Sequence, residues 1–271
     1  MARYGRLFTD AQWEKIRPLL PGKPKRPRGG RPRAHDRKVL EGILWILRSG
    51  ARWQDRPEEF PSPATCWRRL RDWEEQGVWL KIWRAFLAEL NEQQQIKWSE
   101  AFLDGSFAPA KKGVWESGKP KRGKGTKWMV VVDGAGVPLG NHLHAASPSE
   151  VRLAEATLQT IRVGRWGQAG RPRQKPVRVI ADRGYDSDPL RRRLAGRGIE
   201  LIAPHRQNRR KPATQDGRAL RRYKRRWTVE RTFAWFGNFR RLVVRYDRSL
   251  TIYEGFFHIA CFMIVLRKVL K

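Results

Sequence analysis

The distribution of hydrophobic and polar residues divides the chain into two parts with different periodicities. Up to about residue 95, apolar residues recur three and four positions apart, which is the spacing of amphipathic helices. Thr9 and Asp36 are the expected caps of the first two helices. Ser62 precedes the third helix, whose first turn holds Pro63. The predicted helices are residues 10–17, residues 36–49, the segment from Pro63 to about Gly77, and residues 78–94.

Beyond residue 97, short apolar runs separated by Gly, Pro and Asp replace the helical pattern, as is typical of strands. The runs are "KWSEAFLDGSFA" (97–108), "TKWMVVVDGAGVPLGNHLHAAS" (126–147), "PVRVIADRGYD" (176–186) and "GIELIAPHR" (198–206). Helices are expected at residues 149–162, 188–196, 217–242 and about 250–270. This order predicts a mixed α/β sheet with helices on its faces. We therefore expect an all-helical domain at residues 1–95 and an α/β domain at residues 96–271.

The charge balance indicates a polyanionic partner. The 271 residues include 58 Lys and Arg against 26 Asp and Glu, which gives a net charge of +32. Each contact between a cation and a phosphate releases condensed counterions, so nucleic acid is the favoured partner and a membrane surface the weaker alternative. The hydrophobic share of 40% and the 13 Trp allow a sizeable core, so the chain is not a disordered basic tail.

Two groups of cations in the helical part are candidates for DNA contact. The stretch "PGKPKRPRGGRPR" at residues 21–33 is too rich in Pro, Gly and cations to pack. It is interpreted as a mobile basic linker or, alternatively, as a solubilising loop. The third predicted helix points arginines outward, which resembles a helix-turn-helix reader. The candidate contacts are Lys23, Lys25, Arg26, Arg28, Arg68, Arg69 and Arg71.

The sequence favours a bacterial cytoplasmic protein that associates with the nucleoid when it is bound to DNA. Its longest apolar run, "FFHIACFMIVL" at residues 256–266, is shorter than a bilayer span and is interpreted as a buried helix. The first 20 residues are a mixed amphipathic stretch and not a secretory signal. Cys66 and Cys261 lie in apolar or aromatic surroundings and are expected to be core residues in a reducing compartment.

Two aspartates follow apolar strand runs directly. Asp104 follows "AFL" and Asp182 follows "VRVIA", so each is expected near the carboxyl end of a strand, where open α/β sheets bind ligands. The other aspartates of this part have structural explanations in turns, at helix starts or in polar loops. They are Asp133, Asp186, Asp188, Asp216 and Asp247.

A third acid lies within the basic segment "YKRRWTVERTFAW" at residues 223–235. Tyr223, Arg226 and Glu230 are spaced three and four apart, so they share one face of a helix. A solvated Arg–Glu pair has the same spacing and is the bland alternative. Three carboxylates from distant parts of the chain can instead hold two Mg²⁺ ions, which stabilise the attacking and leaving oxygens of phosphodiester cleavage. The cations around Glu230 would then hold the phosphates.

Several of these segments resemble one family of mobile-element enzymes. "LDGSF", "VIADRGYDS" and "YKRRWTVERTFAWFGNFRRL" are similar to the catalytic blocks of bacterial transposases of the insertion-sequence-five family. "FTDAQWEKIRPLLP" and "RSGARWQDRPEEFPSPATCWRRLRDWEEQGVW" resemble that family's N-terminal DNA-binding region. The likeness covers nearly the whole chain.

The resemblance implies an RNase H-like domain with a mixed five-stranded sheet and an Asp-Asp-Glu triad, here Asp104, Asp182 and Glu230. It also implies a Tyr, an Arg three positions later and a Glu four positions after that, which Tyr223, Arg226 and Glu230 satisfy. The signature of related transposases continues to a basic residue seven positions after the Glu. That position is Gly237 here, so Arg240 and Arg241 are the candidate DNA contacts in its place.

The activity implied by the resemblance is the cleavage of element ends and their transfer to target DNA. Two Mg²⁺ ions are the expected cofactors, and Mn²⁺ is expected to substitute for them. The expected partners are double-stranded DNA, as terminal inverted repeats and target, and at least one further copy of the chain, because two ends must be cut in one complex.

Other classes of protein stay open. A non-catalytic DNA-binding protein, such as a regulator or a domesticated transposase, would carry the same charge, but it would have no need for three acids. A nuclease or resolvase that only hydrolyses would share the acids. An RNA-binding protein is disfavoured because the aromatic residues, including Trp67, Trp73, Trp79 and Trp83, fall at core spacing. His142 and His144 are interpreted as ordinary strand residues rather than metal ligands.

Overall fold

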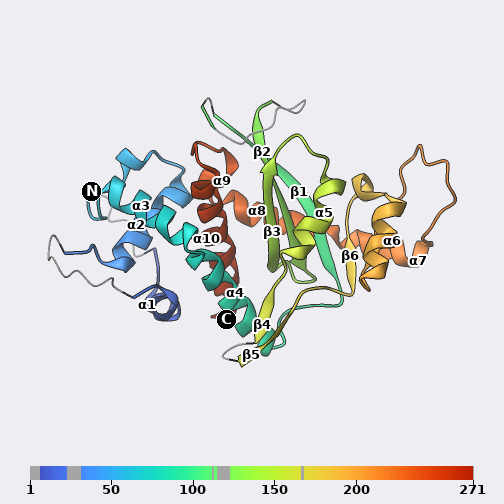
Figure 1. Cartoon of the computed structure of the whole chain (residues 1–271), viewed down its shortest axis with the longest axis horizontal. Helices are drawn as coiled ribbons and strands as arrows, with labels where there is room; N and C mark the ends of the chain where they lie inside the picture. The colour runs from blue at the N-terminus through green and yellow to red at the C-terminus, as the bar shows by residue number, and fades with distance from the viewer. Residues whose placement is uncertain (1–6, 23–31, 112, 115–122, 166–167, 271) are drawn as a thin grey trace.

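A mixed five-stranded sheet lies next to a group of helices (Figure 1) in the computed structural model, which describes residues 7–22, 32–111, 113–114, 123–165 and 168–270. The strands of the sheet are β1 (Ala101–Pro109), β2 (Gly125–Asp133), β3 (Pro138–Ala145), β6 (Arg178–Ile180) and β7 (Glu200–Ile202). Their order is β3-β2-β1-β6-β7, with β1 antiparallel to β2, β2 antiparallel to β3, and β1, β6 and β7 mutually parallel. The predicted RNase H-like mixed sheet is confirmed.

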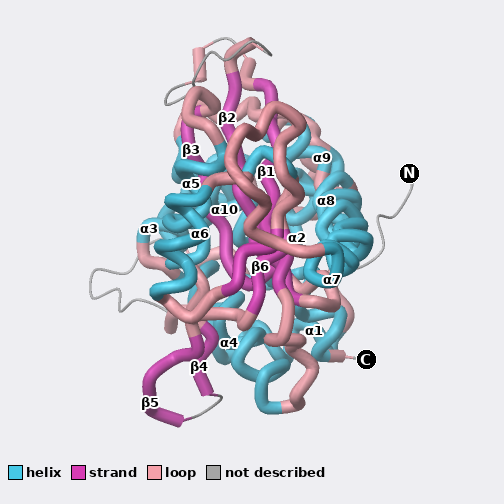
Figure 2. Tube along the Cα trace, turned by 90° about the vertical axis from the view of Figure 1, so that its right-hand side faces the viewer, coloured by secondary structure: helices cyan, strands magenta, loops and turns pink. Residues whose placement is uncertain are grey.

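Helices cover both faces of this sheet. Figure 2 shows α5 and α6 on one side of the strands and α8 and α9 on the other. Their bounds are α5 (Glu150–Gln159), α6 (Asp188–Gly196), α8 (Trp227–Gly237) and α9 (Arg240–Val243). The contacts agree with this view, because α5 touches β1, β2 and β3 while α8 touches β1 and β2.

The N-terminal part is helical, as predicted. Its helices are α1 (Asp10–Ile16), α2 (Asp36–Ser49), α3 (Pro63–Glu75) and α4 (Val78–Glu92). Gly50 ends α2 with a φ of +72°, a backbone conformation that favours glycine. Thirteen residues, 50–62, separate α2 from α3, which is longer than the short turn of a helix-turn-helix. The division into two domains near residue 95 stays a prediction.

Helix α10 (Leu250–Val269) joins the two parts of the molecule. It packs against α3 and α4 on one side and against α9 and β3 on the other, and Figure 1 shows it between them. The helix is long and apolar enough to cross a membrane by length and composition alone, but 78% of its most apolar window is buried inside the structure. The predicted buried helix at residues 256–266 is therefore confirmed as part of a longer one. Cys66 and Cys261 are buried and form no disulfide.

The structure differs from the predicted elements at four places. The expected helix at 217–242 is broken into α7 (Gly217–Leu220), a 3-10 helix η4 (Arg221–Arg226), α8 and α9. Asp36 is the first residue of α2 and does not cap it, because its carboxylate accepts hydrogen bonds from Arg33 and Arg69 instead. Strand β1 continues five residues past Asp104. A small hairpin of β4 (Val163–Arg165) and β5 (Gln168–Arg173) was not predicted.

Candidate active site

The parallel pairing of β1 and β6 brings Asp104 and Asp182 to the same level of the sheet. Phe102 pairs with Ile180, the last residue of β6. Asp104 and Asp182 each lie two residues beyond that pair, so they are neighbours on adjacent strands. The prediction that Asp104 lies at a strand end was wrong, because β1 goes on to pair with β2 and Asp104 faces Val130 in that register. The position is still a carboxyl end with respect to β6.

Asp104 is a buried carboxylate with few compensating partners. It is 7% exposed, its Oδ1 accepts a hydrogen bond from the Gly105 amide at 2.9 Å, and its Oδ2 accepts one from Arg226. Burial raises the pKa of Asp104 to about 6, and Glu150 and Asp182 raise it further, while Arg226 and the Gly105 amide act in the opposite direction. A cation beside Asp104 would remove this penalty on its ionised form.

Asp182 begins the 3-10 helix η3 (Arg183–Tyr185). Its Oδ1 accepts a hydrogen bond from the Gly184 amide at 2.7 Å, and its side chain is half-buried. This cap fixes the direction in which the chain leaves β6. The Asp182 carboxylate therefore stays close to Asp104, as their mutual influence on the pKa of Asp104 indicates.

Arg226 links Asp104 to Glu230. One terminal nitrogen of its guanidinium donates to Glu230 Oε1 at 2.9 Å, and the other donates to Asp104 Oδ2. The third nitrogen, Nε, is buried and has no hydrogen-bond partner within the residues that the structure describes. Burial lowers the pKa of Arg226, but Asp104 and other neighbours, Tyr223 among them, raise it more. The Glu230 side chain is 58% exposed, so it borders solvent at the edge of the site.

Glu100 fastens the basic segment to the sheet, and sequence reasoning missed this role. It is 2% exposed and lies one residue before β1. Its carboxylate accepts hydrogen bonds from Arg222 and from Arg225, the second at 2.6 Å, and Arg225 also donates to the Gly134 carbonyl at 3.2 Å. These contacts hold η4 against the start of β1, where Arg226 can reach Asp104. The signal in the sequence was the single acid directly before "AFL".

Glu150 is a second carboxylate that sequence reasoning missed. It is the first residue of α5 and contributes to the raised pKa of Asp104. The hydroxyl of buried Tyr185 donates to its Oε2 at 3.3 Å. In the sequence, "SPSEV" indicated only a helix start.

The donor set of Asp104, Asp182 and Glu230 fits a hard divalent cation. All three supply carboxylate oxygens, the ligands that Mg²⁺ and Mn²⁺ prefer. The buried charge of Asp104 is incompletely compensated, as its raised pKa indicates. Their oxygens do not all lie within 4.8 Å of one another, and Arg226 lies between Asp104 and Glu230.

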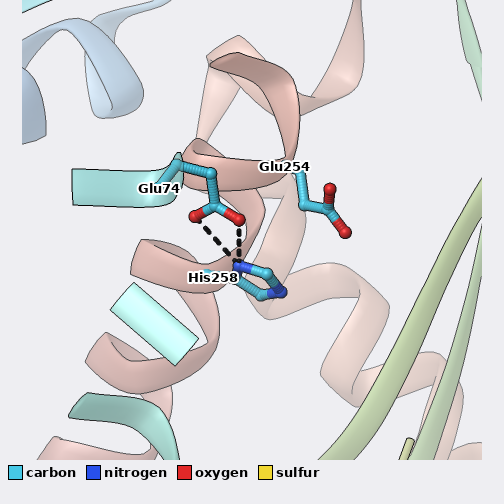
Figure 3. Close-up of side chains that lie close together, drawn as sticks. All are labelled: Glu74, Glu254 and His258. Carbon is cyan, nitrogen blue, oxygen red and sulfur yellow. Dashed lines mark hydrogen bonds and ion pairs between the residues drawn. The ribbon is translucent and has the colours of Figure 1, made fainter. Parts of the chain in front are cut away.

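A different cluster does meet that distance, and within the described part of the chain it is the only one. Glu74, Glu254 and His258 place one ligand atom each within 4.8 Å of the others (Figure 3). His258 Nδ1 lies 3.0 and 3.1 Å from the two oxygens of Glu74. Those are hydrogen-bond distances, so the cluster is explained as a buried polar contact between α3 and α10.

Two arginines predicted to contact DNA point into the protein. Arg241 is 5% exposed and donates to both oxygens of Asp247, each at 3.0 Å, so it is a buried structural residue. Arg69 was expected to face outward, but its side chain is 13% exposed, pairs with Asp36 and lies 4.9 Å from the ring centre of Trp73. Both corrections have the same cause, because a partner acid holds the guanidinium inside.

The remaining candidate DNA contacts are accessible or lie outside the described residues. Arg68 and Arg240 are exposed, the side chain of Arg71 is 39% exposed and pairs with Asp72, and Tyr223 is half-buried next to the core. Lys23, Lys25, Arg26 and Arg28 lie outside the residues that the structure describes.

The other predicted structural residues also find explanations. Asp133 is fully buried and accepts hydrogen bonds from three backbone amides, which is its expected turn role. Asp186 does not cap α6, because Ser187 does. Asp186 instead accepts hydrogen bonds from Arg191 and Arg209, and Asp188 pairs with Arg209. Asp216 caps α7, and Asp247 is the buried partner described above rather than a loop residue. Trp73, Trp79 and Trp83 are buried in the core, and Trp67 packs against it.

Comparison with known proteins identifies the family. Residues 99–266 match the family described as "Transposase DDE domain", and residues 8–83 match "Putative transposase of IS4/5 family". The "Putative transposase for insertion sequence element IS402" of Burkholderia cepacia is 38% identical over 155 residues, which are 54% of this chain and 69% of that protein. The "Putative transposase for insertion sequence element IS6501" of Brucella ovis is 32% identical over 145 residues, which are 52% of this chain and 98% of that protein.

Among solved structures, a piggyBac transposase synaptic complex with hairpin DNA aligns with a TM-score of 0.47 and 11% identity, covering 95% of this chain and 71% of that one. A Mos1 strand transfer complex aligns with a TM-score of 0.27 and 14% identity, covering 92% and 82%. These structural likenesses are too distant to carry an argument about the site. The family match over residues 99–266 spans more than half of the chain, so the protein belongs to the transposase DDE domain family and is a DNA transposase of the insertion-sequence type.

Proposed function

We propose that this transposase binds the terminal inverted repeats of its element, cleaves the phosphodiester backbone there and joins the freed 3′-hydroxyl ends to target DNA. The observation that carries the proposal is the meeting of Asp104 and Asp182 at one level of two adjacent parallel strands, with Arg226 linking Asp104 to Glu230. Three acids that are 48 and 78 residues apart along the chain (182−230 and 104−182) have no need to be gathered in a protein that only binds DNA.

Asp104, Asp182 and Glu230 are proposed to hold two Mg²⁺ ions, with Mn²⁺ as a substitute. Such a pair of ions supplies activation of the attacking oxygen and stabilisation of the leaving oxygen. Arg226 keeps Asp104 and Glu230 oriented in the free protein. Its unpaired Nε–H is a donor that a backbone phosphate can use, and guanidinium groups bind phosphate oxygens well. Arg226 therefore positions both the acids and the DNA.

The DNA-binding surface is proposed to include the accessible cations and Tyr223. Its members are Arg68, Arg71, Arg240, the linker residues Lys23, Lys25, Arg26 and Arg28, and the site residues Tyr223 and Arg226. The excess of cations makes the binding depend steeply on salt. Neutralising the four linker residues together should flatten the slope of log K against log salt, and an unchanged slope would make the linker a spacer.

The proposed organisation is a helical DNA reader at residues 1–95 followed by the catalytic domain at residues 96–271. The two family matches, at residues 8–83 and 99–266, are consistent with this division. Because two element ends must be processed together, we propose a homodimer or larger assembly in the synaptic complex. The proposed location is the bacterial cytoplasm, with nucleoid association when bound to DNA.

The test is a cleavage assay on end-labelled DNA that carries the element ends. The parent protein is expected to cut at the element boundary with Mg²⁺ and not with EDTA. Asp182→Asn is expected to bind the same DNA without cutting it. A parent protein that binds the ends but cuts nothing with Mg²⁺ or Mn²⁺ would be the non-catalytic DNA-binding protein, and the proposal would fail.

A further inference from the structure

Glu150 lies directly over the residue that follows Asp104. A β-carbon built on Gly105 would fall 2.7 Å from the Glu150 Cδ and 2.8 Å from its Oε1. Real β-carbons essentially never approach other atoms so closely. Glycine at position 105 therefore makes room for the carboxylate of α5 beside β1, at the level of Asp104.

A buried tyrosine connects Glu150 to the turn that Asp182 begins. Tyr185 is 0% exposed and ends η3, and its hydroxyl donates to Glu150 Oε2 at 3.3 Å. Burial raises the pKa of Tyr185 well above its usual value, and Glu150, Asp104 and Asp182 raise it further. A single hydroxyl is thus influenced by all three carboxylates, which shows that they converge on one point.

Glu150 is only loosely neutralised within the described part of the chain. Its ion-pair partner there is Lys127, whose Nζ lies 3.8 Å from Oε1 and donates instead to the Pro148 carbonyl at 2.8 Å. The Glu150 side chain is 33% exposed, so ions can reach it from solvent. Asp104 and Glu230 differ in this respect, because they share the guanidinium of Arg226.

A glutamate in the first turn of a helix also stabilises the helix N-terminus. That role needs only a negative charge near the first turn. It does not need a glycine on the neighbouring strand or a buried tyrosine that donates to the carboxylate. The placement over Gly105 is therefore left unexplained by the helix alone.

We propose that Glu150 is a fourth carboxylate of the metal-binding face, on the side of Asp104 and Asp182 opposite to Arg226 and Glu230; this inference rests on the proposed function. Magnesium in proteins keeps several waters and takes one or two carboxylates. Glu150 would bind an ion directly or through one of its waters. The face would then hold four acids instead of three, with the ion nearest Asp104 and Asp182 bound more tightly.

The experiment measures Mn²⁺ binding to the full chain without DNA, by the loss of the free-ion signal in electron paramagnetic resonance. Glu150→Gln keeps the shape of the side chain without its charge, and Glu150→Asp keeps the charge on a shorter arm. Glu155→Gln is the matched control, because Glu155 lies on the same helix and pairs with Arg193 at 2.5 Å. Asp104→Asn reports on the proposed site itself, and thermal melts verify that each variant is folded.

We expect Glu150→Gln to bind Mn²⁺ about 10-fold or more weakly, since even groups that only orient a metal ligand contribute about 10- to 100-fold. Glu150→Asp should fall between Glu150→Gln and the parent, and Glu155→Gln should match the parent. If Glu150→Gln binds as the parent does while Asp104→Asn does not, the inference is wrong and the proposed function stands. If Asp104→Asn also binds as the parent does, the proposed metal site is wrong and the inference fails with it.

Discussion

Asp104→Asn removes the charge of a carboxylate that is 7% exposed while nearly preserving its shape. Burial, reinforced by Glu150 and Asp182, raises the pKa of Asp104 from 3.8 to about 6. An acid whose pKa is raised on folding leaves the protein most stable below its unfolded pKa. That stability is then lost as the pH rises through about 4 to 6. At pH 7 the metal-free parent therefore carries the full penalty of an ionised Asp104.

The size of the effect follows from the pKa difference. A difference of about two pKa units corresponds to about 3 kcal/mol of unfolding free energy at neutral pH. Asn gives up the charge-assisted hydrogen bond from Arg226, which offsets about 1–2 kcal/mol of that gain. We expect Asp104→Asn to be more stable than the metal-free parent by about 1–2 kcal/mol at pH 7. That corresponds to a rise in Tm of roughly 2–6 °C for a chain of this size.

The assay is denaturant unfolding in EDTA between pH 4 and pH 8. The stability difference between Asp104→Asn and the parent should be largest above pH 6 and should disappear near pH 4. Asp72→Asn, an exposed acid on α3, is the control and should change stability by less than about 0.5 kcal/mol. Added Mg²⁺ should stabilise the parent and not the variant. A variant that is less stable than the parent at every pH would refute the reasoning, because the pairing with Arg226 would then outweigh burial.

Three further substitutions separate catalysis, geometry and stability. Glu230→Gln should lose cleavage of end-labelled DNA yet keep its affinity in a mobility-shift assay, and cleavage at the parental rate would exclude Glu230 as a metal ligand. Glu100→Gln should lower the cleavage rate more than DNA affinity, because it loosens the segment that carries Arg226; equal losses of both would contradict this role. Arg241→Ala should lose about 3–5 kcal/mol of unfolding free energy, since it leaves Asp247 buried without its partner. Arg240→Ala, its exposed neighbour, should keep that stability and weaken DNA binding with a salt slope smaller by about 1; the reverse pattern would show that the two roles were misassigned.

The parallel pairing and the first two acids could be predicted because they depend on local patterns. "AFLD" and "VRVIAD" are apolar runs of similar length that end in an acid, and equal runs on adjacent parallel strands bring their ends to one level. The extent of β1 could not be predicted in the same way. Residues 105–109 are stabilised by pairing with residues 125–129, and that pairing depends on a hairpin partner some 20 residues away.

Arginine burial could not be read from spacing. Arg69 and Arg241 lie in basic stretches typical of DNA-binding surfaces, and what holds them inside is an acid elsewhere in the fold. For Arg69 that acid is Asp36, 33 residues earlier. The break of the predicted helix at 217–242 has the same origin, because docking onto Glu100 draws residues 221–226 into a 3-10 helix.

The isolated position of Glu230 in a basic segment is therefore misleading when the sequence is considered alone. In the folded protein the cations of this segment meet acids supplied by β1, with Arg222 and Arg225 on Glu100 and Arg226 on Asp104. Because Glu100 and Asp104 are buried, salt screens these pairs much less than it screens contacts between exposed cations and DNA. Exposed Lys224, by contrast, is free to meet DNA. Raising the salt concentration should thus release the DNA before it disturbs the geometry of the acids, so the segment combines a salt-sensitive grip with a salt-resistant site.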